Sequence, residues 1–424
     1  MARLLYSLAF YLATPLILLR LRWRARKQPA YWQHLGERYG YYPQFTERPL
    51  IWLHAVSVGE TRAAAPLIEV LLRDYPDHAL LLTHMTPTGR ETGAEYGLKY
   101  PGRLFQAYLP YDLPDACGRF LGHFQPRFGL LMETELWPNL IAAARMRSIP
   151  LLLINARLSA RSQRGYARLT GLIGPALAAL GAVAAQTPAD AARLTALGAH
   201  DVRICGNLKF DAPVAAEKLA LGAHWKQSLA GRRVWLAASM REGEEALMLD
   251  ALSHCRVPGL LLLLVPRHPQ RFDEVAALVH GRGLNLCRRS EKMNPGAETQ
   301  VWLGDSMGEM AAYYAAADLA LIGGSLLPFG GQNLIEAAAC GCPVLVGPHS
   351  FNFAQATQDA IDCGAAQRVI DANDAASVAE SLLNDRDALQ AMRDAALQFS
   401  QAHRGATART VALIREVTAP QTRD

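Results

Sequence analysis

A glutamate stands where an apolar segment gives way to a helical pattern, early in the chain. The run that begins at Leu50 leads into "HAVSVGE", and Glu60 closes this motif just before the helical pattern of residues 61–74. A carboxylate in this place can cap the helix, because the positive end of a helix dipole favours an anion. It can also accept a proton from a bound hydroxyl, as a general base does. Both roles stay open here, and the dipole predicts that Glu60 is ionised and therefore a weakened base.

Other charged side chains of the first half also follow predicted strands. The motif "METELWPN" places Glu133 after the apolar run 128–132, and "NARLSARS" places Arg157 after the run 150–154. "GNLKFD" places Lys209 near the point where the pattern of elements restarts. Because ligands bind at the carboxyl ends of strands in open parallel sheets, these side chains are candidates for one site. Glu133 could instead form a structural ion pair, and Lys209 could be a surface lysine.

The second half carries a set of residues suited to a nucleotide. "VPRHP" places Arg267 after a leucine-rich strand, where its guanidinium could hold a phosphate in a bidentate fork or simply lie in solvent. "GDSMGEM" follows the next strand and offers turn N–H groups around residues 307–309. In "GGSLLPFGGQNLIEAAACGC", glycines precede a predicted helix over residues 333–340, whose N-terminus favours anions. Glu336 lies one turn into that helix, where it could accept both hydroxyls of a ribose.

This arrangement resembles the nucleotide-sugar sites of two-domain glycosyltransferases. The chain has no G-x-x-x-x-G-K-[ST] motif and no G-x-G-x-x-G after a strand, which argues against ATP hydrolysis and a dinucleotide dehydrogenase.

Short apolar runs alternate with helical patterns in two series along the chain. One series extends from Leu50 to about residue 211, and a second begins beyond about residue 218. Such alternation predicts parallel sheets with right-handed crossovers, and hence an α/β protein with two doubly wound, Rossmann-like domains. The resemblance to two-domain glycosyltransferases implies the GT-B type of this fold. We expect a membrane anchor and its basic flank over 1–30, an acceptor domain over 31–212 and a donor domain over 213–424. The last helix could pack back on the N-terminal domain. We expect the active site in a cleft between the two domains.

Composition and charge narrow the class of protein. A chain of 424 residues exceeds what one core usually fills. Its seven cysteines are scattered without a C-x-x-C pair, which argues for a reducing compartment and against a zinc ribbon or disulfide framework. The net charge is +5, and the five basic residues between Arg20 and Lys27 account for all of it. We therefore expect no nucleic-acid partner.

The N-terminus has the features of a membrane anchor. Sixteen uncharged residues separate Arg3 from Arg20, Pro15 interrupts them, and the basic cluster follows. A spanning helix needs about twenty residues, so a tilted span and a helix lying in the membrane surface both fit. A buried helix or a signal peptide are the alternatives. The basic flank predicts that the main body faces the cytoplasm.

Seven motifs together carry a resemblance that covers essentially the whole chain. "HAVSVGE", "METELWPN", "NARLSARS", "KFD", "PRHP", "GDSMGE" and "GPHSFNF" occur in the order and spacing of the 3-deoxy-D-manno-octulosonic acid (Kdo) transferase family of lipopolysaccharide assembly. One departure is visible, because the family often reads H-N-P-L-E where this chain has "QNLIE" at 332–336.

The resemblance implies an inverting, metal-independent transfer of Kdo from CMP-Kdo to the lipid A precursor, lipid IVA, at the cytoplasmic side of the cell inner membrane. It implies no cofactor other than the donor substrate. The resemblance implies that Glu60 is the general base and that Glu133 and Lys209 stabilise the transition state. The implied CMP-contacting positions are Pro266, Arg267, Met307, Gly308, Glu309, Asn333, Leu334, Ile335 and Glu336.

Two other functions are weighed against this one. The chain could be a different nucleotide-sugar-dependent GT-B transferase acting on a membrane lipid, or an epimerase that uses a uracil nucleotide. It could also be a membrane-docked nucleotide-binding scaffold without catalysis, in which case replacing Glu60 would change no turnover.

Overall fold

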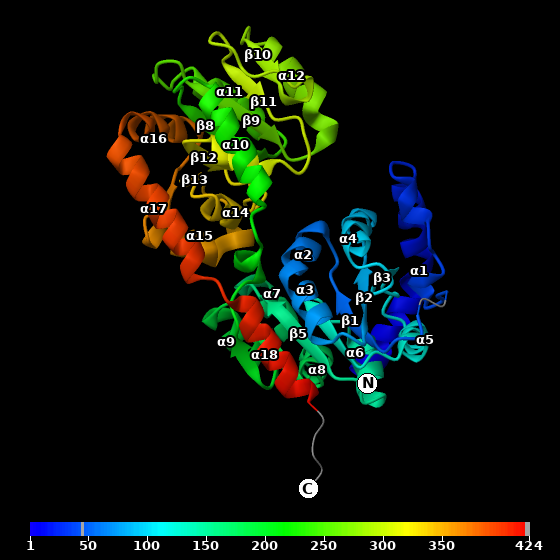
Figure 1. Ribbon diagram of the computed structural model, residues 1–424. Coiled ribbons are helices and arrows are strands. Elements are labelled where there is room, and N and C mark those ends of the chain that lie inside the picture. Colours follow the sequence, from blue (N-terminus) through cyan, green and yellow to red (C-terminus); the bar gives the residue numbers. More distant parts are fainter. Residues whose placement is uncertain (44–45, 420–424) are drawn as a thin grey trace. The chain divides into compact units, whose positions relative to one another are not determined.

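The computed structural model describes residues 1–43 and 46–419. The chain forms two compact α/β units (Figure 1). The first comprises residues Met1–Ala212 together with the C-terminal segment from Arg404, and the second comprises Pro213–His403. Both contain a doubly wound parallel sheet, so the predicted fold class is confirmed.

The first unit is built on a seven-stranded parallel sheet. Its strands lie in the order β3-β2-β1-β4-β5-β6-β7, so the direction of winding reverses between β1 and β4. Their bounds are β1 Leu50–His54, β2 Ala79–His84, β3 Leu104–Tyr108, β4 Phe128–Met132, β5 Leu151–Ala156, β6 Ala182–Ala185 and β7 Val202–Ile204. Every residue of β1, β2 and β4 is buried, which explains why these strands read as continuous apolar runs.

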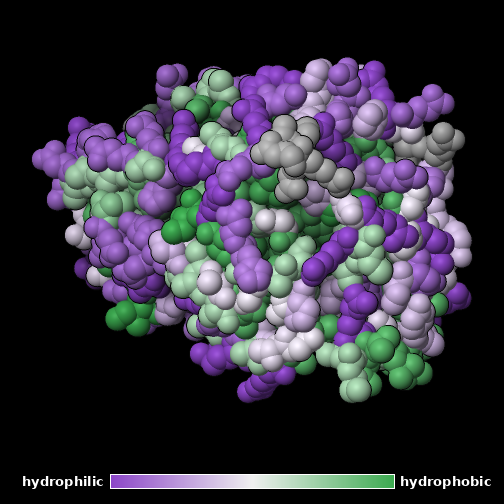
Figure 2. Space-filling model, turned by 90° about the horizontal axis from the view of Figure 1, so that it is seen from below, coloured by the Kyte–Doolittle hydropathy of each residue, from purple (hydrophilic) through white to green (hydrophobic). Residues whose placement is uncertain are grey.

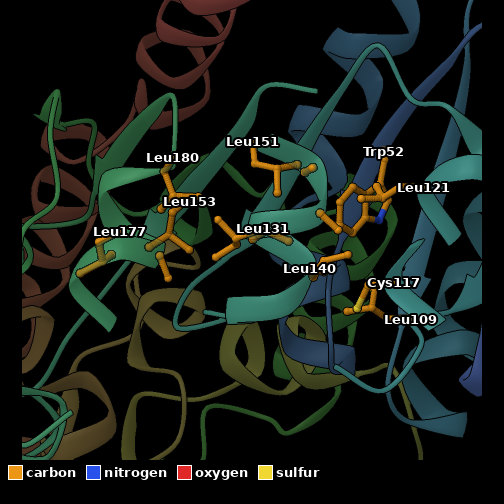
Figure 3. Close-up of a cluster of buried hydrophobic side chains, with 14 of the residues drawn as sticks. Trp52, Leu109, Cys117, Leu121, Leu131, Leu140, Leu151, Leu153, Leu177 and Leu180 are labelled. Atoms are coloured by element: carbon orange, nitrogen blue, oxygen red, sulfur yellow. The ribbon is translucent and has the colours of Figure 1, made fainter. Parts of the chain in front are cut away.

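Helices cover both faces of this sheet. They are α2 Val58–Ala63, α3 Ala65–Asp74, α4 Pro87–Lys99, α5 Pro114–Phe124, α6 Pro138–Met146, α7 Ala160–Ala167, α8 Thr170–Ala178, α9 Pro188–Ala196 and α18 Ala406–Thr418, with the 3₁₀ turns η1 Pro29–Trp32, η2 Glu37–Tyr39 and η3 Leu208–Asp211. One core contains Trp52, Leu131 and Leu153 (Figure 3), and the other contains Leu53 and Leu130. Successive strand residues point to opposite faces, which is why neighbours such as Trp52 and Leu53 enter different cores.

The predicted helix over residues 61–74 is two helices. Ser57 caps the first, and its side chain accepts a hydrogen bond from the backbone N–H of Glu60. The second begins at Ala65, and Pro66 stands within its first turn. Proline has no N–H to donate to the preceding turn, so the α2 hydrogen-bonding pattern stops there and a new helix starts.

The second unit has its own seven-stranded parallel sheet, in the order β10-β11-β9-β8-β12-β13-β14. The strands are β8 Val234–Met240, β9 Leu261–Pro266, β10 Leu286–Arg288, β11 Val301–Leu303, β12 Leu319–Ile322, β13 Val344–Val346 and β14 Ala366–Arg368. The helices are α10 Ala216–Ser228, α11 Glu244–Leu252, α12 Phe272–His280, α13 Met310–Ala316, α14 Leu334–Ala339, α15 Ala354–Asp362, α16 Ala372–Asn384 and α17 Arg386–Ala402, with 3₁₀ turns η4 Pro269–Arg271, η5 Arg289–Glu291 and η6 Phe351–Phe353. Its winding reverses between β8 and β12.

The last helix, α18, belongs to the first unit although the second unit precedes it in the sequence (red in Figure 1). Val411, Leu413 and Ile414 are buried in the core that also holds Leu53. Asp211 lies where the N-terminal segment of this unit ends. Its carboxylate accepts hydrogen bonds from the backbone N–H groups of Gly405 and Thr407 at 2.7 and 2.5 Å. The chain therefore leaves and re-enters the first unit at adjacent points.

The N-terminal helix α1, Ala2–Ala25, is long and apolar enough to cross a membrane. It nevertheless lies against the first unit, where Ser7 donates to Asn139 Oδ1 at 3.1 Å and Tyr11 donates to Asp115 at 2.6 Å. Phe10 packs on the small cluster that contains Leu113. The opposite side of the helix is an exposed apolar stripe: Leu4, Leu5, Leu8, Leu12, Leu16, Leu19 and Trp23.

Elsewhere the surface is mixed. Seen from below in Figure 2, most of it is hydrophilic, with hydrophobic groups gathered in a few places.

Candidate active site

Glu60 lies in the first turn of α2, the helix that follows β1, and is partly buried. Its Oε2 accepts the backbone N–H of Val56 at 2.8 Å, and its Oε1 accepts the hydroxyl of Ser57 at 3.1 Å. Ser57 in turn caps the helix, so the two residues form an arrangement close to a capping box. Glu60 therefore has the capping role, and its carboxylate is fixed in one position by the same contacts.

The prediction that the helix dipole makes Glu60 a weakened base is wrong, because burial outweighs the dipole. Burial raises the pKa of this carboxyl to about 7, and the negative charges of Glu133 and Glu135 add to the rise. The hydrogen bonds from Val56 and Ser57 act in the opposite direction but are outweighed. A carboxylate with this pKa is a far better proton acceptor near neutral pH than an ordinary glutamate. The tertiary environment thus strengthens Glu60 as a base.

Glu133 directly follows β4 and is buried, with a left-handed backbone (φ +56°). Its carboxylate bridges two cations, since Oε2 accepts from Arg157 Nε at 2.7 Å and Oε1 accepts from Lys209 Nζ at 2.9 Å. Burial alone would raise the pKa of Glu133, but the charges and hydrogen bonds of Lys209 and Arg157 together lower it. Glu133 is therefore ionised and in an ion pair, and the structure brings it together with Lys209.

Lys209 is held by a turn that two asparagines organise. Asn207 caps η3 and accepts the N–H of Lys209 at 3.0 Å. Asn155, at the end of β5, accepts the N–H of Leu208 at 3.0 Å and has φ +50°. A left-handed backbone is uncommon outside glycine and marks a constrained position. Sequence reasoning did not single out Asn155, although its place at a strand end inside "NARLSARS" was a usable signal.

These side chains meet at the edge of the sheet where ligands are expected. Glu60 follows β1 and Glu133 follows β4, and these two strands are neighbours at the point where the winding reverses. Doubly wound sheets bind ligands there, because the two connecting segments diverge to opposite faces and leave the strand ends accessible. Arg157 and Lys209 extend this group from β5 and η3.

In the second unit, Pro266 is the buried last residue of β9 and Arg267 is the exposed residue after it. The N–H of Arg267 donates to Met240 O at 2.9 Å, and its Nε donates to Gln332 Oε1 at 3.2 Å. These bonds connect the ends of β9 and β8 to the segment that enters α14. Gln332 directly precedes Asn333 in the sequence, so this bond brings Arg267 near a second predicted CMP-contacting position.

The loop after β11 holds the next three predicted positions. Met307 is exposed, and Gly308 has φ +75°, a conformation that glycine adopts without strain. Glu309 immediately precedes α13 and pairs with Arg289 through two hydrogen bonds of 3.1 and 3.0 Å. Ser306 also donates to Glu309, so this carboxylate has partners within its own unit.

Residues 333–336 form the start of α14. Asn333 caps the helix, and its Oδ1 accepts the N–H of Ile335 at 3.2 Å. The side chains of Leu334 and Ile335 are buried, so only their backbone could face a ligand. Leu334, which stands where the family often has proline, fills this buried position, and the cap is intact. Glu336 is half-buried.

A buried carboxylate that sequence reasoning missed organises the glycine-rich loop after β12. Glu244, at the start of α11, accepts the backbone N–H groups of Arg241, Gly324, Leu326 and Leu327 at 2.9, 2.5, 3.0 and 3.1 Å. Gly323 leads into this loop and lies so close to β8 that an added Cβ would stand 2.4 Å from the carbonyl oxygen of Ser239. Sequence patterns do not reveal this role of Glu244, since its three partners in the loop are 80 to 83 residues away.

No group of three or more His, Cys, Asp and Glu side chains suited to a metal ion occurs in residues 1–43 and 46–419. The polar groups of the two sheet edges are instead single carboxylates, arginines, one lysine and backbone N–H groups.

The comparisons with known proteins identify the family. Residues 33–212 match the family described as 3-deoxy-D-manno-octulosonic-acid transferase (kdotransferase), and residues 240–399 match glycosyl transferases group 1. A 3-deoxy-D-manno-octulosonic acid transferase of Bordetella pertussis is 47% identical, over 97% of this chain and 98% of that protein. The chain belongs to the 3-deoxy-D-manno-octulosonic acid transferase family. It is thus a glycosyltransferase of lipopolysaccharide biosynthesis, as the motifs predicted.

One further member of the family and two solved structures are also similar to the chain. The Kdo transferase of Haemophilus influenzae is 38% identical over 98% of both chains. A glycosyltransferase structure from Rickettsia africae superposes with a TM-score of 0.61 at 12% identity, covering 89% of this chain and all of that one. A putative UDP-N-acetylglucosamine 2-epimerase from Listeria monocytogenes superposes with a TM-score of 0.60 at 15% identity, covering 89% of this chain and 99% of that one. These two structures share the fold alone.

Proposed function

We propose that this Kdo transferase moves Kdo from CMP-Kdo to the lipid A precursor, lipid IVA, with inversion and without a metal ion. The observation that carries the proposal is Glu60, a fixed carboxylate with a pKa of about 7 in the first turn of α2. This helix follows β1, the strand next to the one that precedes Glu133. A base of this pKa is matched to a reaction at neutral pH.

In the proposed step, a hydroxyl of the acceptor attacks the anomeric carbon of Kdo while Glu60 accepts its proton. The new carbon–oxygen bond forms on one face of the sugar, and the bond to the phosphate of CMP breaks on the other. A single displacement of this kind inverts the anomeric centre. CMP leaves with the electron pair of the broken bond, and Glu60 carries the proton until solvent removes it.

The group of Glu133, Lys209 and Arg157 suits the anionic donor. One carboxylate is bonded to two cations, so the group has an excess of one positive charge. Preorganised charge of this sign stabilises negative charge on the Kdo carboxylate or on the departing phosphate. Glu133 holds the lysine and the arginine in place, since it bonds to both at once.

The CMP-contacting positions supply complementary groups. Arg267 offers a guanidinium to the phosphate, and Glu336 offers a carboxylate to the ribose hydroxyls. Leu334 and Ile335 would meet CMP through their backbone, because their side chains are buried and the N–H of Ile335 is already bonded to Asn333. Glu309 would contact CMP while remaining paired with Arg289.

We further propose that α1 lies in the surface of the inner membrane, with the main body on its cytoplasmic side. The helix is anchored to its own unit through Ser7 and Tyr11, so only its exposed stripe is available to lipid. A helix with one apolar face and a basic end suits the boundary between acyl chains and anionic headgroups. This geometry favours an in-plane helix over one that spans the bilayer.

The surface around α7 suits the phosphates of the acceptor. Arg157, Arg161, Arg164 and Arg168 occur between residues 157 and 189 with no acidic residue among them. The three arginines at 161, 164 and 168 are exposed and follow the spacing of one helical face. They could therefore bind an anionic lipid headgroup close to Glu133.

Incubation of the enzyme with CMP-Kdo and lipid IVA, followed by mass spectrometry of the lipid, tests the proposal directly. We expect the lipid to gain Kdo both with and without EDTA. Loss of transfer in EDTA, restored by a divalent cation, would overturn the metal-free mechanism. Products that retain the anomeric configuration of CMP-Kdo would overturn the single displacement.

The variant Glu60→Ala separates catalysis from binding. We expect it to lose transfer while its affinity for CMP, measured by calorimetry, stays near that of the wild type. Simultaneous loss of both properties would indicate a structural role for Glu60. Wild-type turnover in this variant would exclude it as the base.

A further inference from the structure

Arg241 is a half-buried arginine that directly follows β8, and the proposed function gives it no role. The last residue of β8, Met240, has Pro266 of β9 as its register partner, and its carbonyl oxygen accepts the N–H of Arg267 at 2.9 Å. Arg241 and Arg267 are therefore the first residues beyond the ends of two neighbouring strands. Such strands lie about 4.8 Å apart, so the backbones of the two arginines are side by side where the winding of the sheet reverses.

Three carboxylates follow Arg241 within four residues, yet none of them pairs with its guanidinium. Glu245 accepts two hydrogen bonds from Arg271, at 3.0 and 3.2 Å. Glu242 is 81% exposed and lies 4.0 Å from Arg271. Both oxygens of Glu244 are bonded to backbone N–H groups. Among the residues that the structure describes, no acidic side chain forms an ion pair with Arg241.

The guanidinium of Arg241 lies on the ring of Phe329, with its central carbon 4.5 Å from the ring centroid. Phe329 belongs to the glycine-rich loop after β12. Cation–π attraction holds a guanidinium over an aromatic face without using its N–H groups. Nε is buried and has no hydrogen-bond partner, whereas the two terminal nitrogens reach solvent and bond to no acceptor in the described part of the chain. The end of the side chain is thus fixed in place with its donors available.

A glycine in the same loop makes room for the stem of Arg241. Gly324 has φ +70°, and an added Cβ there would stand 3.4 Å from Arg241 Cγ and 3.2 Å from Gln332 Nε2. Gln332 is the residue that accepts a hydrogen bond from Arg267 Nε at 3.2 Å. Glu244 Oε2 accepts the N–H groups of both Arg241 and Gly324, at 2.9 and 2.5 Å. Arg241 is therefore held against the segment that positions Arg267.

The surroundings of Arg241 are positively charged. Burial lowers the pKa of His268, and the charges of Arg241, Arg267 and Arg271 lower it further. An arginine that lies among other cations and has no carboxylate partner is suited to an anionic ligand, because the ligand supplies the missing negative charge. A phosphate matches the planar fork of a guanidinium.

We propose that Arg241 binds the phosphate of the nucleotide donor, beside Arg267. The inference rests on the proposed function, in which the donor is CMP-Kdo. Two guanidinium groups then contact one phosphate from neighbouring strand ends. Arg241 also stabilises the negative charge that the phosphate gains when its bond to Kdo breaks.

The test compares CMP with cytidine, which lacks the phosphate, as ligands of the full-length enzyme in detergent micelles. Arg241→Met and Arg241→Gln both remove the charge. We expect each to weaken CMP binding, measured by calorimetry, by roughly 10–100-fold, because a hydrogen bond to a charged group is lost. Their affinity for cytidine, measured by ligand-observed NMR, should equal that of the wild type, since cytidine offers no phosphate to Arg241.

Two further variants make the result specific. Arg241→Lys keeps the charge but loses the planar fork, and it should lose less affinity for CMP than Arg241→Met does. Arg256→Met removes an exposed arginine that precedes β9, at the opposite edge of the same sheet, and it should bind both ligands as the wild type does.

The possible outcomes separate the two proposals. Wild-type CMP affinity in a folded Arg241→Met or Arg241→Gln variant, or in Arg241→Lys where neither of these folds, overturns the inference. Equal losses for CMP and cytidine overturn it as well, because they would show that Arg241 only shapes the loop. If the wild type binds no CMP or transfers no Kdo, the proposed function fails. If the wild type does both and the Arg241 variants bind CMP normally, only the role of Arg241 fails.

Discussion

Glu60 and Glu133 are the same residue type beyond the ends of two neighbouring strands, yet their surroundings move the two pKa values in opposite directions. Burial and two facing carboxylates raise that of Glu60 to about 7, whereas Lys209 and Arg157 lower that of Glu133. Carboxyl groups whose pKa values diverge in this way divide the work of a site, one exchanging protons and the other keeping its charge. The assignment of Glu60 as base and Glu133 as a fixed anion follows from this contrast.

At the residue scale, the raised pKa makes a prediction about stability as well as rate. A carboxyl whose pKa is higher in the folded than in the unfolded protein favours folding when protonated, and this benefit is lost as the pH rises through about 7. Glu60→Gln should therefore melt at a higher temperature than the wild type above pH about 7, while transfer falls by roughly 10²–10⁴-fold. Calorimetric scans and rate assays at the same pH check both, and a strongly destabilised variant would contradict the argument.

The ion pair of Glu133 and Lys209 should behave as a coupled unit. Glu133→Gln leaves two cations without their shared carboxylate, so it should cost about 3–5 kcal/mol in urea unfolding. Lys209→Met leaves Glu133 paired with Arg157 and should cost less. The double variant should cost less than the sum. The lowered pKa of Glu133 means that its contribution is present at neutral pH and lost only as the pH falls below the usual carboxylate range. Additive losses would show that the pair is not coupled.

Among the elements, the loop after β12 depends on one carboxylate that lies outside it. Glu244 accepts four backbone N–H groups, three of them from residues 324–327. A loop rich in glycine has little preference for a single conformation, because glycine loses more freedom on folding than other residues. The bonds to Glu244 therefore set the shape of the segment at the end of β12.

Replacing Glu244 with glutamine should disturb this loop. The amide has one oxygen in place of two and would turn its NH₂ toward buried donors, which costs about 1–3 kcal/mol for each unsatisfied group. We expect lower stability in urea and weaker CMP binding by calorimetry. Glu242→Gln, at a side chain that is 81% exposed two residues earlier, should leave both unchanged. Normal CMP affinity in a folded Glu244→Gln variant would separate the loop from the nucleotide site.

The exposed stripe of α1 predicts a defined membrane contact. Leu12 and Leu16 are 72% and 68% exposed, and burying a leucine in an apolar phase contributes about 1.5–3 kcal/mol. The variant Leu12→Glu/Leu16→Glu should therefore bind phosphatidylglycerol vesicles at least about tenfold more weakly in co-sedimentation. Leu98→Glu on α4, at a leucine that is 84% exposed, is the matched control and should bind normally. Equal binding by all three proteins would exclude the stripe as the contact.

At the scale of the whole molecule, the chain completes its first unit only after it has finished the second. The side chains of Val411, Leu413 and Ile414 enter a core that strands of the first half have already formed. Asp211, in the N-terminal segment of this unit, accepts hydrogen bonds from the start of α18, in its C-terminal segment, and so joins the two segments. The stability of the first unit thus depends on residues beyond position 403.

Truncation of one side chain of α18 tests this dependence. Ile414 is fully buried, and Ile414→Ala should cost about 2–5 kcal/mol through the lost contacts and the remaining cavity. Hydrogen exchange followed by mass spectrometry should show faster exchange in β1 and β4, with β8 and β9 unchanged. Faster exchange confined to the second unit would contradict the assignment of α18 to the first.

The amino-acid sequence by itself determined the family, the strand–helix alternation and the residues that follow each strand. These features are local, since a motif such as "HAVSVGE" fixes a strand end, a capping serine and a glutamate within a few residues. The pattern also located Glu133 and Lys209 at the ends of their elements. It could not decide whether either residue was paired.

Only the tertiary structure decided what those groups do to one another. Lys209 reaches Glu133 across 76 residues of sequence, and Glu244 reaches the glycine loop across about 80. The charge state of Glu60 depends on burial and on carboxylates that another strand brings beside it. Electrostatic interactions depend on distance and solvent exposure, which arise when the sheet assembles, so the sequence pattern predicted an ionised Glu60 and the fold produced a stronger base.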